Sequence, residues 1–183
     1  MYNLNLTKEQ FSDFLNLFYR VFYPLKNFVN REQFLNIINK KKFKKHFFSF
    51  PVYFGVNKKI YKNIKNKEII SLYYEKKYLF KIKNINFFDI NKKNFGKKIY
   101  GKNYNKHPYF KKFLTENFKF LNFDYFDVDK NNLKHKNFIS PESFKKKYKI
   151  NYKKKLAGFH TRNIPHNAHI WIHEFLTKKY KNL

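Results

Sequence analysis

The sequence predicts an α+β fold in which a helical start is followed by a β-rich middle and by a closing helix–strand–loop–helix unit. Three observations lead to this prediction. Apolar residues recur at helical spacing between Phe11 and Phe22. From Phe47 onward the period changes, and short aromatic runs alternate with charged turns. The polar stretch 131–137 then reads as a linker before the closing unit.

Two helices are expected at the start. Thr7–Gln10 has the pattern of a capping box, and Pro24 is expected to end the helix that it opens. Asn30–Gln33 repeats the pattern for a second helix, which is expected to face the core through three apolar residues, Phe34, Ile37 and Ile38. Lys40–Lys45 reads as a charged connector.

The middle of the chain is expected to form a small barrel or rolled sheet. Phe48–Val56 reads as extended, with Pro51 at an edge or at a strand start. A hairpin is expected from the runs 68–74 and 78–85 around Glu75–Lys77. Lys97–Gly101 and Phe118–Val128 read as further strands.

The closing unit begins at Ser140–Glu142, where a cap serine, a proline and a glutamate are typical of a helix start. Phe144 and Tyr148 give this helix an apolar face. A short strand, Lys153–Phe159, and a helix, Ala168–Tyr180, are expected to follow, with inward residues Trp171, Ile172, Phe175 and Leu176. One such unit leaves a parallel strand without neighbours, which indicates a fragment or a chain that docks with another.

The composition limits the class of protein. The 183 residues correspond to one domain, or to one domain with a piece of another, and no cysteine is present for disulfides or thiolate metal sites. The net charge is +29, yet only three of the 41 basic residues are arginine, so we attribute the lysine excess to AT-rich coding and do not expect nucleic-acid binding. Neither a secretory leader nor an apolar run of the ~18 residues that span a membrane is seen, so a cytoplasmic protein without membrane contact is expected.

The loop 156–169 is the strongest functional candidate. A strand that feeds a loop and a helix N-terminus is typical of a phosphate site. His166 and His169 share one side of the first helical turn, and Arg162 adds a fixed cation for an oxyanion. Asn163 can hold the loop or donate to a phosphate, and the loop lacks a carboxylate base, which favours charge stabilisation over proton abstraction.

Other interpretations of these histidines remain open. A His-x-x-His pair also occurs by chance. His169 and His173 are four apart on the helix, but the zinc-type arrangement of a glutamate between two histidines is absent and no metal site is expected. Taken singly, His160 and His173 fit structural roles.

The segment Gly158–His169 resembles the signature of ATP sulfurylase, the single-polypeptide sulfate adenylyltransferase, which reads Phe-Gln-Thr/Leu-Arg-Asn-Pro-x-His-Arg/Asn-Ala/Gly-His. Four upstream segments are similar to further landmarks of that family in the same order: Tyr23–Val29, Phe50–Val56, Ile99–Pro108 and Ser140–Glu142. Together they cover nearly the whole chain.

The resemblance implies a PUA-like domain over residues 1–136 and, over 137–183, the truncated start of an α/β nucleotidylyltransferase (Rossmann-like) catalytic domain. The implied reaction converts Mg²⁺-bound ATP and sulfate to adenylyl sulfate and pyrophosphate, as in sulfate assimilation. The implied roles are sulfate binding by Arg162 with His160, Thr161 and Asn163, ATP binding by Asn163, His166 and His169, and catalysis by Arg162, His166 and His169.

The chain departs from the family at several positions. His160 replaces a glutamine, Ile164 replaces a proline with Pro165 one place later, and Asn27 replaces a glycine. The family's second catalytic stretch is absent, so either a continuation of the chain or a separate C-terminal polypeptide is expected to complete the site, and a homo-oligomer is a further expectation. The alternatives are a catalytically dead remnant and a basic RNA- or ribosome-associated PUA-like protein.

Overall fold

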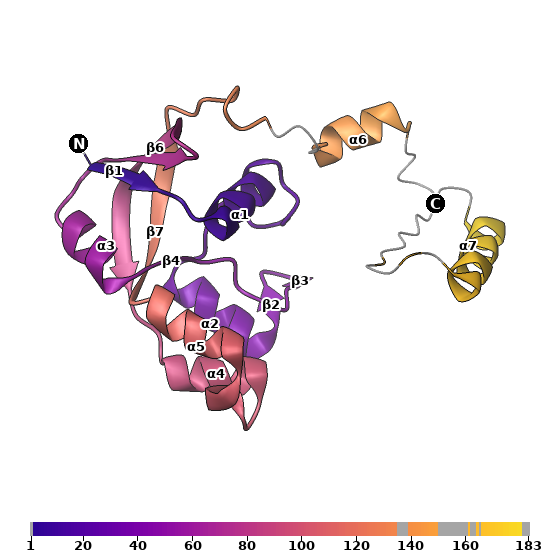
Figure 1. The fold of residues 1–183 in the computed structure, drawn as a ribbon, viewed down its shortest axis with the longest axis horizontal. Coiled ribbons are helices and arrows are strands. Elements are labelled where there is room, and N and C mark those ends of the chain that lie inside the picture. Colours follow the sequence, from indigo (N-terminus) through magenta and orange to yellow (C-terminus); the bar gives the residue numbers. More distant parts are fainter. Residues whose placement is uncertain (1, 135–138, 150–160, 162–163, 165, 181–183) are drawn as a thin grey trace. The chain divides into compact units, whose positions relative to one another are not determined.

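The computed structural model describes residues 2–134, 139–149, 161, 164 and 166–180 (Figure 1). It divides into two compact units, Met1–Phe138 and Ile139–Leu183. The expected strand Lys153–Phe159 lies outside the described residues.

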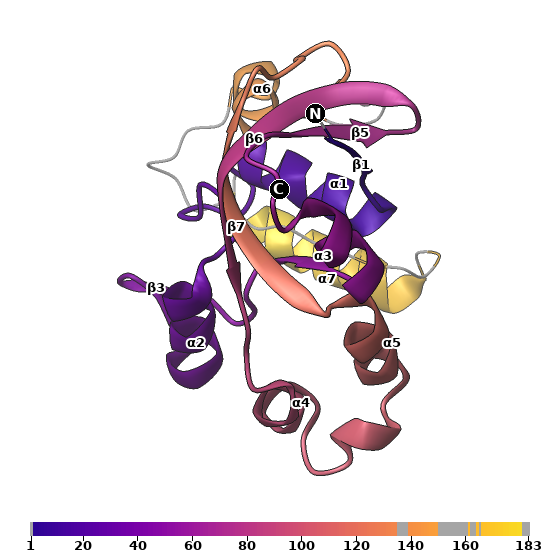
Figure 2. The same cartoon turned by 90° about the vertical axis from the view of Figure 1, so that its left-hand side faces the viewer.

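A five-stranded sheet forms the centre of the first unit, in the order β1-β5-β6-β7-β4. Its strands are β1 (Tyr2–Asn5), β4 (Phe54–Val56), β5 (Ile70–Tyr74), β6 (Lys77–Phe88) and β7 (Lys119–Phe126). β1 pairs with β5 in parallel, and the other neighbours are antiparallel. The register shifts between Lys83 and Asn86, where β6 is irregular. The long strands curl around α1 as half of a barrel, as Figure 2 shows, which agrees with the rolled sheet expected from the sequence.

Two capped helices precede most of the sheet. Thr7 caps α1 (Lys8–Phe18) and Asn30 caps α2 (Arg31–Lys40), each through a complete capping box with the glutamine three residues later. Both boxes confirm the sequence prediction. The predicted length of the first helix is wrong, because α1 ends at Phe18 and Arg20 adopts a positive φ of 63°, before the end expected from Pro24.

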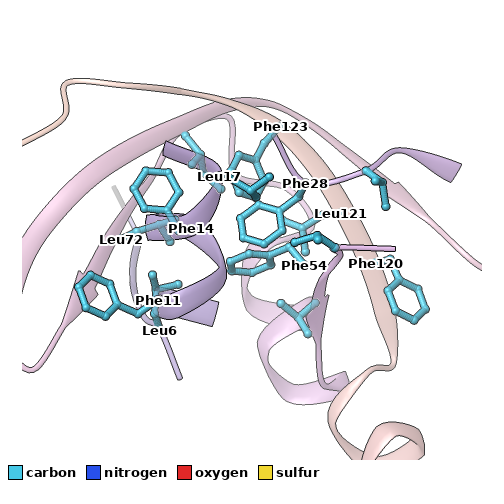
Figure 3. Packing of buried hydrophobic residues seen from close by; sticks show 14 of the residues in the cluster. Leu6, Phe11, Phe14, Leu17, Phe28, Phe54, Leu72, Phe120, Leu121 and Phe123 are labelled. Atoms are coloured by element: carbon cyan, nitrogen blue, oxygen red, sulfur yellow. The ribbon is translucent and has the colours of Figure 1, made fainter. Parts of the chain in front are cut away.

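Phenylalanine rings pack with aliphatic side chains in the core of the first unit (Figure 3). Phe14 of α1 stacks on Phe80 of β6 with 3.8 Å between ring centroids. Phe28, Phe54 and Phe123 form a second group with centroids 5.2–5.7 Å apart. These rings are almost fully buried, and rings in such stacked and edge-to-face pairs add stability beyond area burial. The predicted core residues of α2 are also buried: Phe34, Ile37 and Ile38.

The connections between strands hold three helices that were not predicted. α3 (Lys58–Ile64) follows β4, whereas α4 (Lys92–Tyr100), the 3₁₀ turn η1 (Tyr104–Lys106) and α5 (Pro108–Glu116) lie between β6 and β7. The predicted strand Lys97–Gly101 is wrong, because these residues form the end of α4. Asn91 caps that helix, and Gly101, at φ 78°, ends it. A minimal hairpin of β2 (Lys42–Phe43) and β3 (His46–Phe47) begins within the charged connector and ends just after it.

The second unit holds α6 (Pro141–Lys147) and α7 (Asn167–Lys179). Ser140 caps α6 as predicted, through a bond that its side chain accepts from the Ser143 amide. Phe144 and Tyr148 contact each other with 4.7 Å between ring centroids, although both are exposed. No helix in the described part of the chain is long and apolar enough to cross a bilayer.

Candidate functional site

The start of α7 brings the two predicted histidines together. His166 is the residue before the helix, and the amides of His169 and Ile170 donate to its carbonyl at 2.8 and 3.1 Å. The imidazole rings of His166 and His169 lie 4.0 Å apart between centroids, with an angle of 35° between their planes. The i, i+3 spacing therefore produces the shared face that the sequence predicts.

The tautomer of His169 follows from its hydrogen bond. The backbone amide of His166 donates to Nδ1 of His169 at 3.3 Å. Nδ1 therefore accepts, and the proton of the neutral ring lies on Nε2. The Nε2–H group is of the kind that donates to an anion, and it belongs to a first turn whose amide dipoles favour negative charge. The arrangement can bind and stabilise a phosphate or sulfate oxygen.

The other residues predicted for this site are only partly covered by the structure. Thr161 is half-buried. His160, Arg162 and Asn163 lie outside the described residues, so their predicted roles stay predictions.

The predicted inward face of α7 needs correction. Ile172 and Leu176 are half-buried, but Trp171 and Phe175 are 65% and 49% exposed. Their rings stack on each other at 5.8 Å. The helical period placed the apolar residues on neighbouring turns, but it carried no information about what would cover them.

The expectation that these histidines hold no metal stays a prediction. Among the residues described, no group of three or more His, Asp or Glu side chains converges as metal ligands would. Imidazole nitrogens suit zinc or copper, whereas Mg²⁺ prefers oxygen ligands.

The upstream landmarks of the resemblance are mainly packing residues. In Tyr23–Val29 the buried side chains are Leu25, Phe28 and Val29, and in Phe50–Val56 they include Val52, Phe54 and Val56. Ile99–Pro108 forms the end of α4 and the turn into α5. These segments contribute core residues and connections to the first unit. Their order therefore supports the predicted fold more than the predicted reaction.

A cavity of about 840 Å³ in the first unit is a second candidate that was not predicted. Residues of α1, of the segment 47–57 and of α5 line it, among them the carboxylates Glu9, Asp13 and Glu116. The sequence feature that could have indicated this cavity is Asp13, a carboxylate between the core residues Phe11 and Phe14 of an amphipathic helix. The position of Asp13 in the helical pattern does not show that segments far away in the sequence line a cavity next to it.

The fold itself defines a class of protein, an α+β domain whose curled, mostly antiparallel sheet forms half a barrel around a helix. A family model of the PUA-like domain matches residues 1–121, and the chain belongs to this family. No curated protein matches the chain.

Proposed function

We propose that the chain takes part in sulfate adenylyl transfer, with its second unit supplying one side of the ATP and sulfate site. The observation that carries the proposal is the pairing of His166 and His169 at the N-terminus of α7. The resemblance of the loop 158–169 and of four upstream segments to ATP sulfurylase supports it.

The chemistry follows from what these groups can donate. In the proposed reaction an oxygen of sulfate attacks the α-phosphorus of ATP, and the bond from that phosphorus to the leaving pyrophosphate breaks. Negative charge grows on the phosphate oxygens in the transition state, where N–H donors at fixed positions stabilise it most. Nε2–H of His169 is such a donor, and the ring of His166 lies beside it. In the proposal Arg162 binds sulfate with His160, Thr161 and Asn163, and Asn163 also contacts ATP.

We propose further that a separate polypeptide completes the site. Three apolar side chains of α7 are exposed in this structure, namely Ile170, Trp171 and Phe175. Neighbouring exposed apolar groups of this kind are typical of surfaces that another protein covers.

The test is ATP formation from adenylyl sulfate and pyrophosphate, measured with the chain alone and with a candidate second polypeptide added. We expect His169→Ala to lower the rate about 100-fold or more, in the range found for lost transition-state donors. His173→Ala, one turn further along α7, is the matched control and should retain activity. Absence of activity in every mixture rejects the proposal, and nucleotide binding without turnover would favour the inactive remnant.

RNA binding is a second candidate function, and one cluster favours it. The ammonium groups of Lys58, Lys92 and Lys119 lie 5.7–6.0 Å from the centroid of the Phe118 ring on the first unit. Cations around an aromatic ring are a common way to hold single-stranded nucleic acid. Burial lowers the pKa of Lys92, Asp89 opposes this effect, and the positive charge of Lys119 adds a smaller lowering. Lys119 itself pairs with Asp89. A bound phosphate would offset the cost of burying the Lys92 charge.

The RNA candidate is tested with short single-stranded RNA across a salt series. Changing Lys58, Lys92 and Lys119 together to Gln should reduce the salt dependence of binding by more than the same change at three lysines elsewhere, Lys102, Lys106 and Lys111. Equal effects of the two triple variants, or loss of all binding by ~0.2 M salt, would show only non-specific attraction to a basic protein.

A further inference from the structure

We infer that the cavity between α1 and α5 binds a small organic cation, one ammonium or guanidinium group on an apolar body. This site belongs to the PUA-like unit and is independent of the proposed adenylyl transfer. Its volume of about 840 Å³ lies within the range of small-molecule sites.

The walls of the cavity are fixed by contacts between distant segments. The side-chain amide of Gln10 donates to the carbonyl of Gly55 at 2.8 Å, which ties α1 to β4. Lys112 of α5 pairs with Glu9 of α1 at 3.3 Å. In Figure 1 the chain leading into β4 lies between these two helices. The space is therefore held open by the scaffold rather than formed by one loop.

The charge of the lining is opposite to that of the whole protein. The chain has only 12 acidic residues against 41 basic ones, yet three of the 12 line this cavity, namely Glu9, Asp13 and Glu116. Lys112 is the single basic residue in the described lining, and it pairs with Glu9 and, at 3.7 Å, with Glu116. One lysine thus serves two carboxylates, while the third has no cationic partner among the described residues.

Asp13 is the group that needs a ligand. It is half-buried, and no hydrogen bond or ion pair reaches its carboxylate from any side chain or backbone group that the structure describes. Carboxylates in this position are usually paired, because an unpaired charge loses its hydration without compensation. Burial raises the pKa of Asp13 to about 6, and the negative charge of Glu9 contributes to that rise. A bound cation would supply the missing partner.

Aromatic rings make up a large part of the remaining lining. Tyr53 packs against Phe113 of α5 edge to face at 5.8 Å and lies 6.2 Å from Phe50. Burial raises the pKa of Tyr53, as do, in decreasing order, Tyr100, Asp13 and Glu116, so both carboxylates act on one half-buried phenol. Other rings line the space: Phe22, Phe47, Phe48, Tyr100 and Tyr109. Aromatic faces attract organic cations.

This combination selects against the other ligand classes. Three carboxylates repel phosphates and nucleic acid. A divalent metal needs several ligands at one point, and no group of three acidic or histidine ligands converges among the described residues. A neutral apolar ligand would leave Asp13 unpaired. A monovalent cation with an apolar body satisfies the carboxylate and the rings together.

The test uses the full chain and three probes of similar shape: phenethylamine, phenethyl alcohol and phenylacetate. Binding is measured by calorimetry and by NMR at about pH 7. We expect the amine to bind with a Kd of about 1 mM or lower, the alcohol at least about tenfold more weakly, and phenylacetate not at all. Failure of the amine to bind at about 10 mM, or equal binding of amine and alcohol, overturns the inference.

Variants then locate the site. Asp13→Asn should weaken amine binding about tenfold or more, while Asp13→Glu should retain most of it. Asp89→Asn, the same change outside the cavity, is the control and should leave binding unaltered. Unchanged affinity in Asp13→Asn contradicts the inference.

The pH dependence gives a second readout that a structural role would not produce. The titratable groups that face the site are Glu9, Asp13, Tyr53, Tyr100, Tyr109, Lys112 and Glu116. With a pKa of about 6, Asp13 is largely ionised at pH 7 and largely protonated at pH 5. Amine affinity should therefore fall about tenfold over that interval in the wild type and stay nearly constant in Asp13→Asn. If the amine affinity of the wild type did not change between pH 7 and pH 5, Asp13 would be rejected as the partner of the cation.

Discussion

At the scale of single residues, Asp13 links the stability of the PUA-like unit to pH. Its folded-state pKa is about 6, against an ordinary value of 3.8. Below about pH 4 the carboxyl is protonated in both states and costs nothing. Between pH 4 and 6 the unfolded chain loses the proton while the folded chain keeps it, so stability falls as pH rises. Above pH 6 the penalty is complete.

Asp13→Asn should therefore stabilise the free protein at pH 7 by on the order of 1 kcal/mol, because the amide carries no charge to desolvate. The gain should shrink as pH falls and vanish below about pH 4. Urea unfolding of wild type and variant at several pH values measures it. The pKa of Glu9 is lowered, first by its backbone hydrogen bond and then by Lys112. Its effect on the pH dependence of stability is therefore opposite to that of Asp13. Glu9 is present in both proteins, so the difference between them reports Asp13 together with its interaction with Glu9. A gain that is constant with pH would contradict the raised pKa.

At the scale of elements, local chemistry explains which predictions held. The capping boxes of α1 and α2 and the hairpin of β5 and β6 depend on neighbouring residues, and all three are present. The strand predicted at Lys97–Gly101 is wrong. Two apolar residues after a pair of lysines are compatible with both helical and strand spacing. The helix cap at Asn91 decided in favour of a helix. α5 was missed although Pro108 at its first position is a typical helix start.

The candidate sites likewise include one that the sequence predicts and one that it does not. The contact between His166 and His169 follows from helical spacing and was predictable. The cavity around Asp13 was not, because it joins three segments that lie far apart in the sequence, from α1 to α5. Sequence patterns report a residue's own element, whereas enclosure depends on how elements pack.

The turn between β5 and β6 carries a stability prediction at this scale. Tyr74 pairs with Lys77, so the loop has two residues, Glu75 and Lys76, both at positive φ (49° and 64°). Such turns favour Asn followed by Gly, and side chains like those present are strained there. The double substitution Glu75→Asn with Lys76→Gly should raise the free energy of unfolding by roughly 1 kcal/mol.

Thermal and urea unfolding would measure this change. Lys77→Gly, one residue later in the extended strand, is the control. It should destabilise by about 0.5–1 kcal/mol, because glycine there only adds freedom to the unfolded chain. Stabilisation by both variants would mean that turn geometry is not the cause.

At the scale of the whole molecule, the apolar core and the paired histidines belong to different units. Every buried apolar side chain in the described residues lies between Leu4 and Leu133, and that range falls within the first unit. The family match, residues 1–121, lies within it as well. The described part of the second unit contains α6 and α7, of seven and 13 residues, with no buried side chain.

We therefore expect a protein of residues 1–138 to fold by itself with the stability of the full chain, because burial of apolar area dominates folding free energy. Urea unfolding followed by tyrosine fluorescence should give the same midpoint, within experimental scatter, for both proteins. A peptide of residues 139–183 should show weak, non-cooperative helicity, since isolated helices shorter than ~12–15 residues are marginal in water. A marked loss of stability in the shorter protein would mean that residues after 138 supply core contacts.

Addition of the proposed second polypeptide should raise the helicity of the 139–183 peptide, and no increase would count against docking on the exposed face of α7.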